Sequence, residues 1–136
     1  MFTHVSKIRV RYAETDKMGF VYYGYYTFYY EVGRTEAIRS LGVSYKSIED
    51  SGILMPVLEF KSTYVLPAKY DDMLTIISSI KEMPTRKIVF HTEIQNENRQ
   101  ILNFGETTLV FLDKDSKRIN RIPEEIEQAL KPYFIK

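Results

Sequence analysis

The segment from Glu14 to Tyr23 contains the residues of this sequence that are best placed to do chemistry. Asp16 and Gly19 lie in this loop-like stretch, which leads directly into a tyrosine-rich helical pattern. The first N–H groups of a helix have no intrahelical acceptor and carry roughly half a positive charge. Such donors can bind a developing oxyanion, and a nearby carboxylate such as Asp16 can act as general base or nucleophile. The same aspartate could instead only order the turn, so the residues alone leave both roles open.

Other catalytic arrangements are missing from the sequence. The absence of cysteine excludes disulfides, thiol catalysis and thiolate metal sites. Neither Gly-x-Gly nor Gly-x-Ser-x-Gly occurs, so neither a nucleotide-binding loop nor a serine nucleophile elbow is indicated. The two histidines, His4 and His91, are far apart and show no ligand spacing, and His91 is expected to be a structural residue within a strand. We therefore expect no metal site and no resident cofactor.

The composition is that of an ordinary globular protein. The chain has 136 residues, of which 44% are hydrophobic and 27% are charged, and this suits one domain spanning residues 1–136. Its formal net charge of +1 provides no long-range field for nucleic acid or an anionic membrane. The first residues lack the apolar core of a signal peptide, and no apolar run is long enough to span a membrane. We expect a cytoplasmic protein that neither binds nucleic acid nor inserts into membranes.

A long helix is predicted directly after the Asp16 segment, from about Tyr23 to Leu41. Its apolar face repeats at three- and four-residue steps through Tyr26, Tyr29, Tyr30, Gly33, Ala37 and Leu41. We expect the later tyrosines of this stretch to lie in the core. The earlier ones gather at the helix start, where they can line a pocket: Tyr22, Tyr23 and Tyr25.

Strands account for most of the remaining pattern. Alternating or β-branched runs predict strands at Val5–Tyr12, Leu58–Tyr64, Met73–Ile80, Ile88–Ile94 and Ile101–Leu112. Short helices are predicted at Ser44–Ser51, with Ser44 as N-cap, and at Glu124–Lys131. One long helix with about five strands indicates an α+β fold built on an antiparallel sheet. Because one helix covers such a sheet incompletely, the remaining apolar surface favours a partner subunit.

The motif around Asp16 resembles that of a known family. Asp16-x-x-Gly19-x-Val21-Tyr22-x-x-x-Tyr26, followed by Glu31-x-x-Arg34-x-Glu36, is similar to the 4-hydroxybenzoyl-CoA thioesterase family of hotdog-fold acyl-CoA thioesterases. The similarity of layout extends over nearly the whole chain. It implies a hotdog fold, in which an antiparallel sheet wraps a long helix. It also implies hydrolysis of an acyl-CoA thioester to free acid and coenzyme A.

The resemblance also implies roles for individual residues. Asp16 takes the position of the catalytic aspartate, as base on water or as nucleophile through an acyl-enzyme anhydride, and the Tyr23 backbone N–H polarises the thioester carbonyl. Substrate contacts are expected from Gly19, Val21, Tyr22, Tyr25, Tyr26, Arg86 and Lys87. The last two could bind the phosphates of coenzyme A, which is part of the substrate, or could form an ordinary solvated turn. Because family members have active sites between subunits, a homodimer or homotetramer is expected.

The sequence departs from the family pattern at the helix start. Many relatives carry histidine where Tyr23 stands and asparagine where Tyr25 stands, so Asp16 must act here without a histidine neighbour. Tyrosines at the mouth favour an aryl or short branched acyl group. An alternative is a non-catalytic hotdog protein that binds acyl-CoA or an acyl carrier protein. Further alternatives are an interaction module with structural tyrosines and, ranked last, a dehydratase, since dehydratases normally use a loop histidine.

Overall fold

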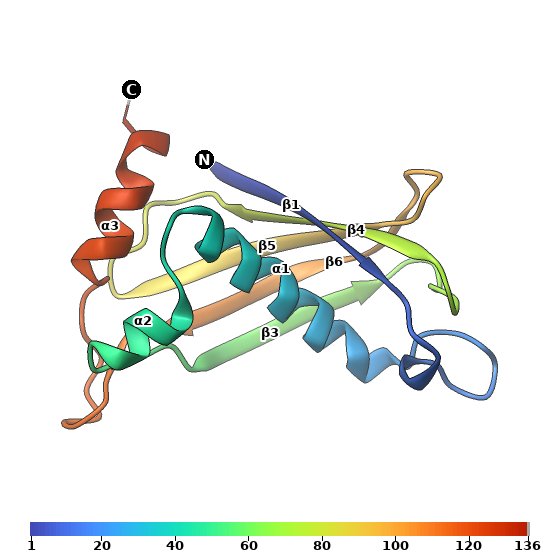
Figure 1. The fold of residues 1–136 in the computed structure, drawn as a ribbon, viewed down its shortest axis with the longest axis horizontal. Coiled ribbons are helices and arrows are strands. Elements are labelled where there is room, and N and C mark those ends of the chain that lie inside the picture. The colour runs from blue at the N-terminus through green and yellow to red at the C-terminus, as the bar shows by residue number, and fades with distance from the viewer. Residues whose placement is uncertain (136) are drawn as a thin grey trace.

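A five-stranded antiparallel sheet forms the body of the computed structural model, which describes residues 1–135 (Figure 1). The strand order is β1-β4-β5-β6-β3. These strands are β1 (Phe2–Arg9), β3 (Val57–Tyr64), β4 (Met73–Ile80), β5 (Lys87–Gln95) and β6 (Ile101–Val110). A separate short pair consists of β2 (Ile53–Leu54) and β7 (Leu112–Asp113). Side chains of β4 alternate between buried and half-buried, because one face of the sheet is covered and the other is open.

The long helix α1 (Tyr26–Ser40) crosses one face of this sheet (Figure 1). It contacts β1, β4 and β5, and a 3-10 turn at Tyr23–Tyr25 precedes it. Two shorter helices lie at the end of the molecule away from that turn, α2 (Tyr45–Asp50) and α3 (Glu124–Leu130). Further 3-10 turns are Tyr12–Glu14 and Lys131–Tyr133. None of the helices within residues 1–135 is both long and apolar enough to cross a membrane.

A polar row divides the core beneath α1 into two parts. The row runs across β4, β5, β6 and β3 through Ser78, Thr92, Gly105 and Ser62, which lie opposite one another. One part of the core packs among α1, α2 and α3, and the other contains three buried tyrosines of α1: Tyr26, Tyr29 and Tyr30. The helix approaches the sheet closely at Gly33, where an added Cβ would lie 2.5 Å from Ser78 Oγ. The small residues along the row therefore allow α1 to pack closely against the sheet.

Strand β3 is a free edge of the sheet. It pairs only with β6, so the N–H and C=O groups along its other side have no strand partner among the described residues. Several of its apolar side chains are also exposed: Val57, Leu58 and Tyr64. An exposed apolar edge of this length is a template for pairing with another chain.

The predicted α+β class and its sheet of about five strands are confirmed. The predicted strand Met73–Ile80 coincides with β4, which lies inside the sheet. The short helix α2 begins as predicted, because Ser44 Oγ accepts a hydrogen bond from the Ser47 N–H at 3.1 Å. The tyrosines predicted for the core are buried at 3% exposure or less.

Two predicted boundaries near the site are wrong. The predicted strand reaching Tyr12 ends at Arg9, and Tyr12 lies in a 3-10 turn with 77% of its surface exposed. The chain turns there because the Glu14 side chain accepts the Arg11 backbone N–H, and the period-two pattern carries no sign of this bond. The predicted helix start at Tyr23 is a 3-10 turn, and the α-helix proper begins three residues later.

Candidate active site

Asp16 begins a tight loop, and the backbone of this loop donates hydrogen bonds to one of the two Asp16 carboxylate oxygens. Its backbone N–H donates to the Phe20 carbonyl oxygen at 2.8 Å. Oδ1 accepts the backbone N–H groups of Met18 at 2.9 Å and Phe20 at 3.3 Å. Gly19 has a positive φ of 81°, which lets the chain reverse without strain. No residue among 1–135 donates to Oδ2, so Asp16 is oriented through one oxygen and keeps the other free.

The Asp16 loop is fastened to the connection between β3 and β4. The Val21 N–H donates to the Ala68 carbonyl oxygen at 2.8 Å, and Phe20 forms a β-bridge with Lys69. Val21 also pairs with Thr15 across the base of the loop. The position of the carboxylate therefore depends on a segment distant in sequence as well as on the loop itself.

The 3-10 turn at Tyr23–Tyr25 presents unpaired backbone donors at the same end of the molecule. The Tyr25 N–H donates to the Tyr22 carbonyl oxygen at 2.9 Å, which closes the turn. Throughout the described chain, the N–H groups of Tyr23 and Gly24 meet no acceptor. Free N–H groups at the start of a helical turn suit an oxygen that gains negative charge.

A pocket with a volume of about 380 Å³ joins the Asp16 loop to the turn. It is lined by Asp16, Met18, Phe20, Val21, Tyr23, Tyr26, Tyr64, Val65, Leu66 and Pro67. Among the described residues that line it, Asp16 alone is charged. Apolar and aromatic walls around a single acid suit an apolar group whose polar end must meet the carboxylate.

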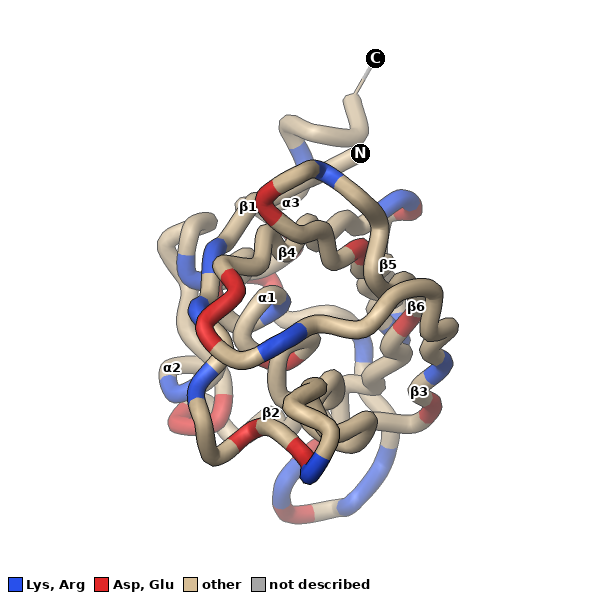
Figure 2. Tube along the Cα trace, turned by 90° about the vertical axis from the view of Figure 1, so that its right-hand side faces the viewer, with Lys and Arg blue, Asp and Glu red and all other residues tan. Residues whose placement is uncertain are grey.

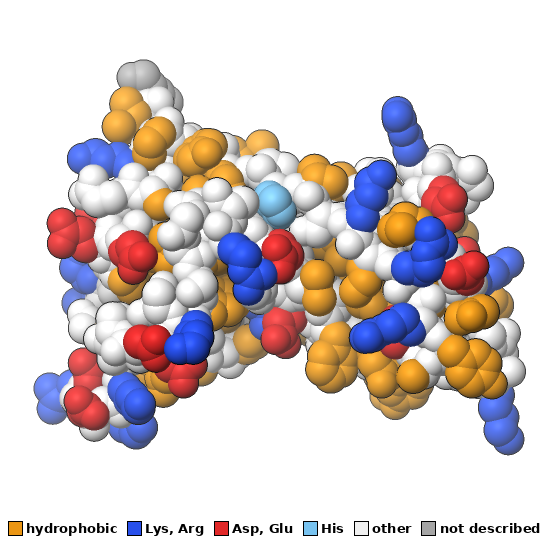
Figure 3. Space-filling view, in the orientation of Figure 1, with side chains coloured by type: hydrophobic (Ala, Val, Ile, Leu, Met, Phe, Trp, Pro, Cys, Tyr) orange, Lys and Arg blue, Asp and Glu red, His pale blue; other side chains and the backbone are white. Residues whose placement is uncertain are grey.

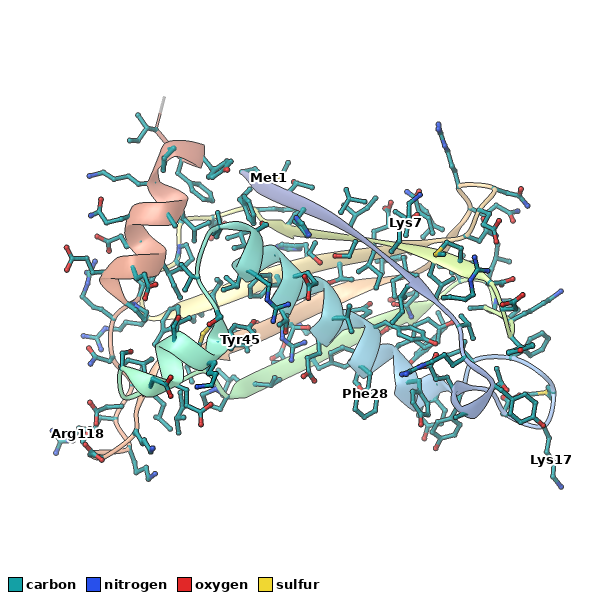
Figure 4. All side chains as sticks on the ribbon, in the orientation of Figure 1. Met1, Lys7, Lys17, Phe28, Tyr45 and Arg118 are labelled. Carbon is teal, nitrogen blue, oxygen red and sulfur yellow. The ribbon has the colours of Figure 1, made fainter. Side chains whose placement is uncertain are left out.

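Aromatic side chains remain exposed around this end of the molecule. Figure 3 shows hydrophobic side chains gathered over the start of α1, and Figure 4 labels Phe28 among them. The exposed aromatic residues are Tyr12, Tyr22, Tyr23, Phe28, Tyr64 and Tyr70. The rings of Tyr22 and Tyr23 lie 4.7 Å apart. Exposed apolar side chains gathered in one place mark a ligand site or an interface.

The structure brings four of the predicted site residues together in the pocket lining: Asp16, Val21, Tyr23 and Tyr26. Three others lie in the same loop and turn but outside that lining: Gly19, Tyr22 and Tyr25. Gly19 shapes the loop, and the Tyr25 ring packs against Phe28 with centroids 5.3 Å apart.

The two predicted phosphate-binding cations lie at the other end of the sheet. Arg86 ends the β4–β5 connection and Lys87 begins β5. Arg86 Nη1 donates to the carbonyl oxygen of Ile119 at 3.4 Å, next to Arg118. Figure 4 labels Arg118 and Lys17 at opposite ends of the molecule. Within one chain, these cations therefore do not meet the Asp16 loop.

A larger hollow of about 570 Å³ lies on the open face of the sheet, away from α1. Its lining includes Lys61, Lys81, His91, Glu93 and Glu106. His91 Nδ1 lies 3.4 Å from Glu106 Oε1, and the histidine lies within strand β5, as predicted, opposite this acid. The hollow contains no helix start, and we do not assign the chemistry to it.

Glu14 is a buried residue of this region that the sequence analysis did not single out. Its Oε1 accepts the Tyr29 hydroxyl at 2.9 Å, and its Oε2 lies 2.9 Å from Arg11 Nη2. Burial raises the pKa of Glu14. Hydrogen bonds from Arg11 and Tyr29 together lower this pKa by more than burial raises it, so it lies below its ordinary value. Burial and the neighbouring Glu14 raise the pKa of Tyr29. In the sequence, the one feature that points to Glu14 is its position two residues before the candidate catalytic Asp16.

Charges of both signs surround the site. Figure 2 looks onto this end of the molecule and shows acidic and basic residues interspersed. Arg9 lies 3.7 Å from Asp71, and Arg11 pairs with Glu14. Because charges of opposite sign are interspersed here, this end of the molecule can contact a charged ligand but does not attract it over a long range.

Comparisons with known proteins point to one family. Residues 10–130 match the family model described as the thioesterase-like superfamily. The putative acyl-CoA thioesterase YneP of Bacillus subtilis is 36% identical over 115 residues, which cover 83% of this chain and 83% of that protein. The acyl-CoA thioester hydrolase YbgC of Escherichia coli O6:H1 is 32% identical over 124 residues, which cover 91% of this chain and 92% of that protein.

A solved structure agrees over the whole chain. The DHNA-CoA thioesterase from Staphylococcus aureus superposes with a TM-score of 0.85 at 29% identity, and the match covers 100% of this chain and 97% of that one. The long helix against a five-stranded antiparallel sheet is therefore a hotdog fold of the thioesterase type. The chain belongs to the thioesterase-like superfamily, as the motif around Asp16 predicts.

Proposed function

We propose that this chain hydrolyses acyl-CoA thioesters to a free acid and coenzyme A, with residues 1–136 acting as one hotdog domain. The observation that carries the proposal is the pairing of two unused groups in one pocket. Within residues 1–135, neither Asp16 Oδ2 nor the Tyr23 backbone N–H has a hydrogen-bond partner, and both residues line the same apolar pocket. The names of its relatives support the same reaction class.

The free groups fit the two needs of thioester hydrolysis. The thioester carbonyl oxygen accepts a hydrogen bond from the Tyr23 N–H, which stabilises the negative charge that develops there. Asp16 Oδ2 takes a proton from water, whose oxygen attacks the carbonyl carbon. The C–S bond then breaks, and the thiolate of coenzyme A leaves and is protonated. Attack by Asp16 itself, followed by hydrolysis of the anhydride, gives the same products.

The pocket walls support an aryl or short branched acyl group. Tyr23, Tyr26 and Tyr64 contribute rings to the lining, and the Tyr26 and Tyr64 rings meet edge to face at 5.2 Å. Flat acyl groups gain from such rings because aromatic pairs favour offset and edge-on contacts. Long saturated chains have no comparable advantage there.

We propose a homo-oligomer that completes the site, either a homodimer or a homotetramer. If two copies pair antiparallel along the free edges of β3, the Val57 end of one β3 lies beside the Tyr64 end of the other. Arg86 and Lys87 of the second copy then lie at the same end of the joined sheet as Asp16. These cations could bind the phosphates of coenzyme A, which they cannot do for the Asp16 of their own chain.

Thiol release from a panel of aryl, short-chain and long-chain acyl-CoAs tests the proposal. Asp16→Asn keeps the Oδ1 acceptor that orders the loop but loses the carboxylate, so we expect kcat to fall about 10²- to 10⁴-fold. Asp71→Asn is a matched control, because Asp71 is an exposed neighbour at a positive φ of 70° that asparagine tolerates. No release by the wild type would overturn the function. Unchanged release by Asp16→Asn would overturn the site.

A non-catalytic protein that binds acyl-CoA or an acyl carrier protein is the second candidate. The open, aromatic mouth of the pocket favours it, since many exposed rings surround a single acid. It predicts thermal stabilisation by acyl-CoA without thiol release, in both the wild type and Asp16→Asn. We also propose a cytoplasmic location, because the chain has no cysteine and reducing compartments do not favour disulfides.

A further inference from the structure

Glu14 is a buried acid that the reaction above does not use. The residue is 3% exposed, and both of its carboxylate oxygens accept hydrogen bonds. Oε1 accepts the Arg11 backbone N–H at 2.9 Å and the Tyr29 hydroxyl at 2.9 Å. Oε2 accepts Arg11 Nε at 3.1 Å and Nη2 at 2.9 Å. A buried carboxylate needs such partners, because its desolvation is costly when it is unpaired.

The backbone of Glu14 makes a further bond to the oxyanion side of the site. Its carbonyl oxygen accepts the N–H of Tyr22, the residue before Tyr23, at 2.9 Å. One residue therefore contacts the chain leaving β1 through Arg11, the first turn of α1 through Tyr29 and the entry to the 3-10 turn through Tyr22. Asp16 follows it by two residues. Glu14 is therefore a buried anchor that contacts both segments that carry the reacting groups, the Asp16 carboxylate and the Tyr23 N–H.

We propose that Glu14 is a positioning residue that fixes the distance between the Asp16 carboxylate and the Tyr23 N–H, an inference that rests on the proposed thioesterase function. The bond to Tyr29 is the link that ties this anchor to α1. Without it, the loop and the helix start can shift relative to each other. Small displacements of reacting groups cost catalysis far more than they cost binding, because the rate depends on near-attack geometry.

Two adjacent tyrosines of α1 offer a matched test. Tyr29→Phe removes the hydroxyl that binds Glu14 and leaves the ring in place. Tyr30→Phe also removes a buried hydroxyl, but one that binds Asn103 and Ser62 at the polar row and has no bond to the site. Both rings are fully buried, so the two variants should lose similar stability. We expect Tyr29→Phe to lower kcat about 10- to 100-fold with little change in KM, and Tyr30→Phe to leave kcat unchanged.

Glu14→Gln provides the complementary variant. Its amide oxygen can still accept the bonds made to Oε1, whereas its NH₂ group faces the Arg11 guanidinium with donors on both sides. Glu14→Gln thus breaks the anchor on its Arg11 side, whereas Tyr29→Phe breaks it on its α1 side. We expect each to lower kcat, and the double variant to lose little more than either alone. If Glu14→Gln does not fold, the Tyr29 and Tyr30 pair still decides the inference.

Asp16→Asn, assayed alongside, separates this inference from the proposed function. If Asp16→Asn abolishes turnover while Tyr29→Phe matches Tyr30→Phe in kcat, the positioning role is overturned and the function stands. If Asp16→Asn retains full turnover, the proposed site itself is overturned. Equal losses of kcat in Tyr29→Phe and Tyr30→Phe would show a general effect of stability and also overturn the positioning role.

Discussion

The hydroxyl of Tyr64 donates to the carbonyl oxygen of Tyr23 at 3.0 Å, and this bond joins the end of strand β3 to the turn that starts α1. The two residues are distant in sequence but line the same pocket. The edge strand therefore shapes the wall of the acyl pocket, in addition to offering a free edge for pairing.

Removing the Tyr64 ring should change the acyl preference. Tyr64→Ala deletes an aromatic wall, and aromatic contacts contribute about 0.5–1.5 kcal/mol, so kcat/KM for benzoyl-CoA should fall about two- to tenfold relative to octanoyl-CoA. Tyr64→Phe keeps the ring and loses only the bond to Tyr23, so it serves as the control. A ratio unaffected by Tyr64→Ala would show that the substrate does not contact this wall.

Subunit complementation should reveal sites shared between two copies. Asp16→Asn chains and Arg86→Ala/Lys87→Ala chains should each be weakly active as homo-oligomers. Co-refolding the two should restore roughly a quarter of wild-type activity, because half of the dimers are mixed and one of their two sites is intact. Co-refolding Asp16→Asn chains with Asp16→Asn/Lys87→Ala chains is the control and should restore none. Full activity of the Arg86→Ala/Lys87→Ala chains alone would place these cations outside the site. Mixed dimers no more active than either parent would contradict a site shared between two copies.

Gly33→Ala should destabilise the fold, although alanine is the better helix former. The added Cβ would lie 2.5 Å from Ser78 Oγ and 2.7 Å from Ile76 Cγ2. Overpacking of this kind costs about 1–3 kcal/mol, which outweighs the roughly 1 kcal/mol that alanine gains over glycine within a helix. Urea unfolding measures the change. Adding Ser78→Ala should restore part of the loss, and a stable Gly33→Ala protein would show that α1 can move away from the sheet.

The stability contributed by Glu14 should depend on pH in the acid range. Its pKa lies below the ordinary value of 4.5, so the folded state favours the charged form. This contribution is complete above about pH 4.5 and is lost as pH falls through the folded-state pKa. The difference in Tm between the wild type and Glu14→Gln should therefore be largest near neutral pH and should shrink below pH 4.5.

The half-exposed acid Glu36, which pairs with Arg39, is the control for this pH series. A surface ion pair contributes about 0–1 kcal/mol, so Glu36→Gln should change Tm little at any pH. A difference between the wild type and Glu14→Gln that stays constant down to pH 3 would contradict the charged state assigned to Glu14.

The pattern of apolar residues predicts most of this fold because burial repeats with the period of each element. Met73–Ile80 is found at its predicted bounds because its side chains alternate between a covered and an open face. Tyr26, Tyr29 and Tyr30 are predicted for the core by their helical spacing and are buried. For the segment that carries Asp16, the periodicity predicts only that a strand ends and a helix begins, and it does not predict the conformation of the loop between them.

Periodicity carries no information about the remaining features of the site. The turn at Tyr12 depends on a bond from Arg11 to the Glu14 side chain, and hydrophobic patterns do not register such bonds. A buried charged residue such as Glu14 also contradicts the average preference of its type. The distance of Arg86 from Asp16 follows from strand order, because β4 leads away from the Asp16 loop and the next turn lies at the far end.

The hydrogen bond from Val21 to Ala68 has a consequence for how the protein is made. As the nascent chain leaves the ribosome, the Asp16 loop emerges long before the segment that fastens it, and β1 must wait for β4 to be synthesised before it can pair. Contacts of this sequence separation form late, because closing the intervening chain costs entropy. Catalytic competence is therefore a property of the completed chain, and N-terminal fragments that end before β4 should be inactive.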